Sequence, residues 1–162
     1  MAMTTIWFDE SLRKKHWPRP LADEWHREYP QLFDDDDLRI TQQQEQGHFY
    51  EWLAAITLFH RSGVLALVEK YLFGRTHPRK DRIVRRLLTP DQIACLRSLP
   101  NQPPDLLLYT PTFDRFWFAE VKGPTDHLRP VQLRTHETIM ATLGVEVEIV
   151  RFQRVKSGLT RG

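Results

Sequence analysis

Apolar positions along this chain recur with the spacing of helices in several segments. In residues 48–62 the large apolar side chains fall at positions 49, 52, 53, 56 and 59, which is one helical face, and Gly63 follows as a stop signal. Residues 130–143 show a similar pattern between a proline in the first turn and a glycine just past the end. The pattern predicts helices over both segments, and two further helices over residues 80–88 and 91–99.

Other segments have the length and composition of strands. Residues 105–110, 115–122 and 145–152 are rich in aliphatic and aromatic residues, and a four-residue turn at 111–114 joins the first two. Residues 64–72 are largely apolar, and periodicity does not distinguish a helix from a short buried strand there. The resulting order is a helix, an undecided and partly helical region, two strands, a helix and a strand. We therefore expect an α/β fold with a small mixed sheet flanked by helices.

Residues 1–46 differ in composition from the rest of the chain. They contain three tryptophans, Trp7, Trp17 and Trp25, among several prolines and many charged residues. We expect an α-helical N-terminal extension that packs through these aromatic residues, followed by one domain over residues 47–162. Asp34 to Asp37 form an acidic run. We interpret this run as a solvated loop or a helix N-terminus rather than a metal site.

The composition narrows the class of protein. With 162 residues and 41% hydrophobic side chains, the chain can form one domain with a single core. It contains no run of about 18 apolar residues, so we expect no membrane span. The N-terminus lacks the apolar stretch of a signal peptide. The single cysteine, Cys95, excludes a disulfide scaffold and most structural zinc modules. We expect a cytoplasmic protein, associated with the nucleoid if the source is bacterial.

Charge is distributed unevenly along the chain. Residues 1–50 carry 6 Lys/Arg against 10 Asp/Glu, whereas residues 51–162 carry 17 against 11. The densest basic stretch runs from Arg75 to Arg86, which favours a polyanionic partner. The alternative is a solvated basic helix face. The candidates for phosphate contacts that position DNA without reading its sequence are Arg79, Lys80, Arg82, Arg85, Arg86 and, close after Lys122, His127.

The predicted hairpin brings acidic side chains together. A turn that pairs Thr110 with Arg115 places Asp105 opposite Glu120, with Cβ atoms about 5 Å apart. Lys122 then shares a face with Glu120, and Val121 points to the other face. Directly opposed carboxylates destabilise a sheet unless a cation offsets their charge, and their oxygens suit Mg²⁺ or Mn²⁺. The alternative is a rim of solvated charges at a strand end.

The same residues carry a family resemblance. Pro104-Asp105 followed by Glu120-Val121-Lys122 resembles the PD-(D/E)XK signature of the restriction-endonuclease-like superfamily. The longer string PPDLLLY…FAEVKGPTDHLRPVQ is similar to the VRR-NUC family, over roughly residues 47–152. Two features depart from the family pattern: Pro103 stands where a glycine is usual, and the helix after Gly-Pro begins with Arg129-Pro130, without a Ser or Thr cap.

The resemblance implies a role for each matching residue. Asp105 and Glu120 would ligate a divalent metal, with the carbonyl of Val121 as a third oxygen, and Lys122 would position the attacking water. Glu51 resembles the helix carboxylate that this superfamily places near the metal; the alternative is a solvated carboxylate. Gln132 lies on the inward helical face, and the resemblance implies that it reaches the active site. The alternative for Gln132 is a structural bond to backbone.

These observations predict a Mg²⁺- or Mn²⁺-dependent DNA endonuclease, a phosphodiester hydrolase, and the resemblance implies a 5′-phosphate product. Structured or branched DNA such as a flap or junction is the expected substrate, in DNA repair or recombination, and stand-alone members of the family imply a homodimer. The alternative is a catalytically inactive nucleic-acid-binding domain of the same fold. A third interpretation, based on the Trp-rich acidic N-terminus, is a scaffold protein. We also expect the acidic run to lie over the basic groove and to weaken DNA binding.

Overall fold

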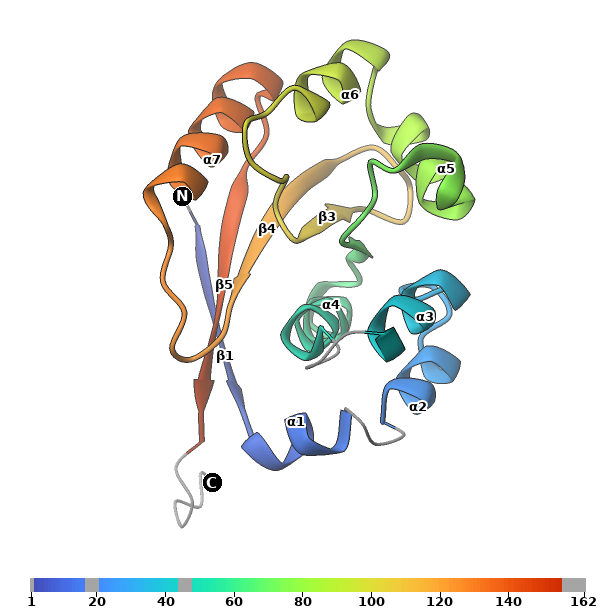
Figure 1. The fold of residues 1–162 in the computed structure, drawn as a ribbon, viewed down its shortest axis with the longest axis vertical. Helices are drawn as coiled ribbons and strands as arrows, with labels where there is room; N and C mark the ends of the chain where they lie inside the picture. Colours follow the sequence, from blue (N-terminus) through green and yellow to red (C-terminus); the bar gives the residue numbers. More distant parts are fainter. Residues whose placement is uncertain (1, 17–20, 44–47, 156–162) are drawn as a thin grey trace.

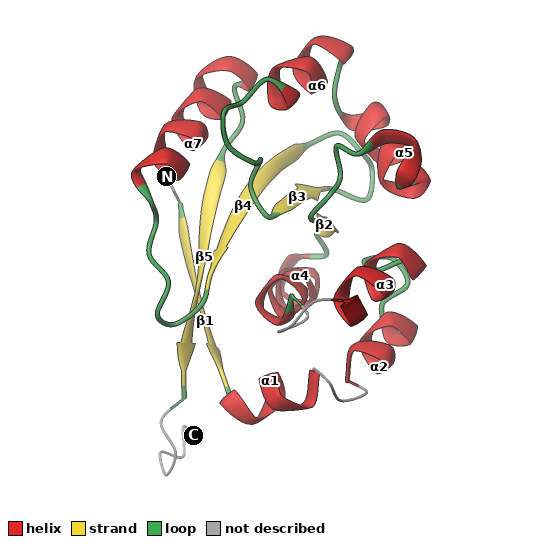
Figure 2. Ribbon diagram, in the orientation of Figure 1, coloured by secondary structure: helices red, strands yellow, loops and turns green. Residues whose placement is uncertain are grey.

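The structure, a computed structural model, describes residues 2–16, 21–43 and 48–155. Its centre is a five-stranded mixed sheet with the order β1-β5-β4-β3-β2 (Figure 2). The β1–β5 and β4–β5 pairs are parallel, and the β2–β3 and β3–β4 pairs are antiparallel. The strands are β1 Met3–Phe8, β2 Leu65–Val68, β3 Leu106–Tyr109, β4 Phe116–Lys122 and β5 Val147–Arg154. The expected α/β class with a small mixed sheet is confirmed.

Helices cover both faces of this sheet (Figure 1). Side chains of β3 alternate between two cores: Leu106 and Leu108 face one, and Leu107 and Tyr109 face the other. The first core is covered by α1 Glu10–His16, α2 Leu21–Glu28, α3 Asp35–Gln43 and α4 Phe49–Ser62. The second is covered by α5 Pro78–Leu87, α6 Pro90–Arg97 and α7 Pro130–Leu143. A short 3₁₀ turn, η1, spans Gly74–Thr76.

The hairpin forms with the expected register. Leu107 pairs with Phe118, and the N–H of Thr110 donates to the carbonyl of Arg115 at 3.1 Å. The undecided segment at 64–72 contains the strand β2, which pairs with β3 and sends Leu67 to one core and its neighbours to the other. Helices cover both faces of the sheet at β2, so apolar residues are favoured at every position of this strand. The alternation of polar and apolar residues that normally marks a strand is therefore absent.

The N-terminal residues are helical over α1 to α3, as expected, but they begin with a strand that the pattern did not predict. β1 pairs in parallel with β5 at the sheet edge, and its inward side chains are Ile6 and Phe8. Trp25 packs against Phe49 with ring centroids 6.0 Å apart, whereas Trp7 stays 46% exposed. Trp17 and the expected boundary between residues 46 and 47 lie outside the described residues.

The acidic run begins α3, so its interpretation as a helix N-terminus is correct. The N–H of Asp37 donates to Asp34 Oδ1, and the N–H of Asp34 donates to Asp37 Oδ2, each at 2.9 Å. The expectation of a solvated run is wrong for Asp37, because its carboxylate is buried against helix α5. Among the residues described, no helix has the length and apolar character needed to cross a bilayer.

Candidate active site

Four elements bring polar side chains to one end of the central strands. Asp105 immediately precedes β3, Glu120 and Lys122 end β4, and Glu51 lies in the first turn of α4. Glu69 follows β2, and its N–H donates to the carbonyl of Asp105 at 2.9 Å. Because β2, β3 and β4 are neighbours in the sheet, their polar ends meet beside the start of α4.

Asp105 is held by the neighbouring strand. The hairpin register ends at Leu106 and Ala119, and Asp105 directly precedes it. The N–H of Val121 donates to Asp105 Oδ2 at 2.8 Å. The Val121 side chain faces the α4 side of the sheet, opposite to Glu120. The structure thus brings Asp105 to the end of β4 that also carries Glu120.

Gln132 links the buried ends of β4 and α7. Its Nε2 donates to Glu120 Oε1 at 3.0 Å, and its Oε1 accepts from Lys122 Nζ at 3.1 Å. The same Oε1 accepts from the N–H of Arg129 at 3.0 Å, which is the bond that the side chain at the third helical position makes to the N-cap backbone in a capping box. Lys122 Nζ lies 3.7 Å from Glu120 Oε1. Gln132 therefore sets the relative position of the carboxylate and the ammonium, and this contact to side chains goes beyond a bond to backbone.

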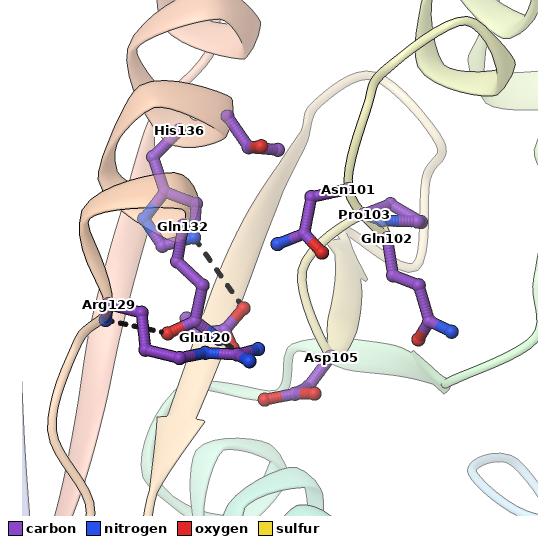
Figure 3. Close-up of a pocket in the computed structure, with 9 residues that line it drawn as sticks. Asn101, Gln102, Pro103, Asp105, Glu120, Arg129, Gln132 and His136 are labelled. Atoms are coloured by element: carbon purple, nitrogen blue, oxygen red, sulfur yellow. Dashed lines mark hydrogen bonds and ion pairs between the residues drawn. The ribbon is translucent and has the colours of Figure 1, made fainter.

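His136 reaches Glu120 from the next turn of α7. Its Nε2 lies 3.5 Å from Glu120 Oε2, and the residue is 2% exposed. His136 and Gln132 are four residues apart, so they share one helix face. Both carboxylate oxygens of Glu120 therefore face side chains of α7 (Figure 3). We did not expect this role for His136, although its spacing from Gln132 was a usable signal.

Glu51 is only half-buried and lies in a second small cluster. Side-chain ligand atoms of His48, Glu51 and Glu69 lie within 4.8 Å of one another, and His48 Nδ1 is 3.2 Å from Glu69 Oε1. Burial, and then the charge of Glu69, raise the pKa of Glu51 to about 7. Sequence reasoning missed His48 and Glu69. The available signals were the position of His48, three residues before Glu51, and that of Glu69, directly after a buried apolar run.

Mutual repulsion marks the whole acidic cluster. Burial raises the pKa of Asp105 well above its usual value, and the charges of Glu120, Glu51 and Glu69 raise it further. Carboxylates that repel in this way hold a cation well, and oxygen donors with an imidazole at the margin suit Mg²⁺ or Mn²⁺. The residues present therefore fit the divalent metal that the family resemblance implies.

The basic stretch on α5 is largely engaged in contacts within the protein. Lys80 is 0% exposed, and its Nζ lies 2.6 Å from Asp37 Oδ1. The expectation that Lys80 contacts DNA is wrong, because a buried, paired ammonium cannot reach a phosphate. Arg79 Nη1 lies 3.3 Å from Asp34 Oδ2, so the acidic run does contact the basic stretch. The effect of that contact on DNA binding stays a prediction.

The remaining candidate phosphate contacts are exposed: Arg82, Arg85, Arg86 and His127. Arg85 pairs with Asp81 at 3.0 Å, and the guanidinium of Arg86 lies 3.8 Å from the centre of the Phe113 ring. None of these four residues lines the cavity next to Glu120. The structure therefore does not bring them together with the acidic cluster, and their contact with DNA stays a prediction.

The mixed sheet covered by helices on both faces is consistent with a restriction-endonuclease-like core. A family model, the VRR-NUC domain, matches residues 40–153, which is more than two thirds of the chain. The chain therefore belongs to the VRR-NUC family, a nuclease domain family of the restriction-endonuclease-like superfamily. No curated protein and no solved structure matches the chain significantly.

Proposed function

We propose that this protein is a metal-dependent endonuclease that hydrolyses phosphodiester bonds in DNA. The observation that supports the proposal most is the convergence of Asp105, Glu120 and Lys122 at one end of β4. Gln132 links Glu120 to Lys122, and the N–H of Val121 holds Asp105. A structural role alone does not account for two buried or half-buried carboxylates that repel each other beside a buried ammonium. Membership of a nuclease family supports the same conclusion.

Asp105, Glu120 and Glu51 would hold Mg²⁺ or Mn²⁺ through carboxylate oxygens, with the carbonyl of Val121 as a further donor. When bound, such a cation polarises a phosphoryl oxygen and lowers the pKa of a bound water. The acidic cluster supports this assignment because burial and the charges of Glu120 and Glu69 raise the pKa of both Asp105 and Glu51. His48 and Glu69 lie beside Glu51 and would help to define the position of the ion.

Lys122 would act on the attacking water and on the phosphate. Its ammonium is held by Gln132 Oε1 at 3.1 Å, which leaves further N–H donors for a water or a phosphoryl oxygen. The water oxygen would lose a proton to solvent and attack phosphorus, and the bond from phosphorus to the 3′ oxygen would break. The 3′ oxygen would leave and take up a proton, so that the products are a 5′-phosphate and a 3′-hydroxyl. Gln132 would keep the ammonium close to the reacting atoms, and it would keep Glu120 oriented.

Structured or branched DNA, in repair or recombination, is the substrate class we propose, with phosphate contacts from Arg82, Arg85 and Arg86. These arginines are exposed on α5 and would position DNA without reading its sequence. We propose a homodimer as the working assembly, because the resemblance to stand-alone members of this family implies one.

A cleavage panel tests the proposal. Duplex, flap, splayed and four-way DNA are incubated with the protein, with and without Mn²⁺. We expect cleavage only with metal, and its loss in Asp105→Asn and Lys122→Ala. The matched controls are Asp91→Asn and Lys14→Ala, which remove the same charges at exposed positions of α6 and α1. Cleavage that persists in both site variants would contradict the assignment. DNA binding without any cleavage would instead favour the inactive-domain alternative.

A further inference from the structure

We propose that the cavity between α7 and the segment before β3 binds a backbone phosphate of the DNA strand, next to the phosphate that is cleaved. This inference rests on the proposed function and adds a substrate subsite to it. The cavity has a volume of about 320 Å³ and lies directly beside Asp105 and Glu120. Figure 3 shows Asn101 and Arg129 approaching it from opposite sides.

The walls of the cavity differ in chemistry. Asp105 and Glu120 form the acidic part, which belongs to the metal site already described. Arg129, Thr135 and Asn101 form the other part, and each of these side chains can donate hydrogen bonds. A ligand that fills the cavity therefore meets these donors as well as the carboxylates, which favours an anion with several acceptor oxygens.

Thr135 carries a hydroxyl without a partner. The residue is 3% exposed, and its Oγ1 has no hydrogen-bond partner among the described residues. Thr57 and Thr138, which also lie in helices, donate to the carbonyl four residues earlier, at 2.7 and 3.0 Å. Buried polar groups without partners are rare and costly. The unpaired hydroxyl of Thr135 therefore marks a place where a ligand oxygen is expected.

Arg129 supplies the positive charge. Its side chain is exposed, and within the described part of the chain its guanidinium forms no ion pair. The amide of Asn101 likewise has no hydrogen-bond partner among those residues. The guanidinium, the amide and the buried hydroxyl can all donate hydrogen bonds to the oxygens of a phosphodiester. The positive charge of the guanidinium disfavours a second cation in the same cavity. A strand that brings one phosphate to Asp105 and Glu120 can place a neighbouring phosphate here.

DNA binding by the full chain tests the subsite. Affinity for a labelled flap DNA is measured by fluorescence anisotropy in Ca²⁺, for the wild type, Arg129→Gln and Thr135→Val. We expect Arg129→Gln to weaken binding about tenfold, as for loss of a charge-assisted hydrogen bond, and Thr135→Val to weaken it roughly threefold. The control is Arg134→Gln, which removes the same charge from an exposed position on the same helix and should change affinity less than about twofold.

A second measurement locates the phosphate. Single methylphosphonates, which are neutral, replace the phosphates around the cleavage site one at a time. We expect one position at which the neutral group weakens wild-type binding and Arg129→Gln adds no further loss. DNA ending in a phosphate should bind no better than DNA ending in a hydroxyl, because the proposed ligand is an internal phosphate.

The outcomes separate this inference from the proposed function. Equal affinities for Arg129→Gln and Arg134→Gln, absence of a coupled phosphate, or a strong preference for a terminal phosphate would each overturn the subsite. Coupling at one phosphate in a protein that never cleaves DNA would support the subsite while refuting nuclease activity. A wild-type protein that binds no DNA would overturn both. Thermal unfolding of each variant verifies that it is folded.

Discussion

Asp37 Oδ1 and Lys80 Nζ lie 2.6 Å apart in an ion pair that is almost completely buried. Lys80 also donates to the carbonyls of Val68 and Glu69, at 2.7 and 2.9 Å. The pair therefore joins α3, in the N-terminal region, to α5 and to the end of β2. Because Glu69 belongs to the acidic cluster, one ion pair connects the packing of the N-terminal region to one wall of the candidate active site.

Asp37→Ala should strongly destabilise the protein, because it leaves the Lys80 ammonium buried without its carboxylate. We expect a loss of about 3–5 kcal/mol in the free energy of unfolding, measured by urea denaturation. Arg85→Ala, which breaks the exposed pair with Asp81, is the control and should cost less than about 1 kcal/mol. The double variant Asp37→Leu/Lys80→Met should recover most of the loss, since no unpaired charge remains. A small effect of Asp37→Ala would show that water reaches Lys80.

The elements predicted correctly are those whose signals are local. The helices at 48–62 and 130–143 end at glycines, and the hairpin register follows from the turn at 111–114. The meeting of Asp105 and Glu120 follows from that register alone. Such features need no knowledge of distant residues, which is why pattern and spacing were sufficient to predict them.

The features that were missed depend on distant parts of the chain. β1 has only two inward apolar side chains, and it forms because β5 offers a free edge about 145 residues later in the chain. Lys80 looked solvated because the run around it is basic, and only its contact with Asp37 shows that it is buried. His48, Glu69 and His136 each had a local spacing signal, but only tertiary packing shows that these side chains reach the site.

Asp105→Asn should stabilise the metal-free protein. Burial and the charges of Glu120 and Glu51 raise the pKa of Asp105, so its carboxylate is unfavourable in the folded state at neutral pH. Asparagine removes that charge and can still accept from the N–H of Val121. We expect a higher free energy of unfolding than that of the wild type, measured by urea denaturation in EDTA. Mn²⁺ should stabilise the wild type and not the variant. A less stable variant would contradict the repulsion described for the cluster.

The contribution of Glu51 to the stability of the metal-free protein should fall as pH rises from about 4.5 to about 7. The pKa of Glu51 is about 7 in the folded protein, above the ordinary value of 4.5 for a glutamate, so the folded state binds this proton more tightly. The contribution of Glu51 is therefore favourable at low pH and is lost as pH rises through the folded pKa. Glu51→Gln cannot titrate, so its stability advantage over the wild type should grow from pH 5 to pH 7.5, by roughly 2 kcal/mol at most. Thermal unfolding across this range in EDTA measures the difference, and a constant difference would refute the raised pKa.

Gln132→Ala should slow DNA cleavage about 10–100-fold while leaving DNA affinity nearly unchanged. The amide holds Glu120 Oε1 and Lys122 Nζ at 3.0 and 3.1 Å, and its loss lets both groups move away from their relative position. The same oxygen caps α7 through the N–H of Arg129, so a loss of about 1 kcal/mol in stability is also expected.

A purely structural role would lower stability without changing the rate constant of the folded enzyme. Single-turnover cleavage below the unfolding temperature therefore separates the two roles. Glu137→Gln, at an exposed position on the same helix, is the control and should leave both quantities unchanged.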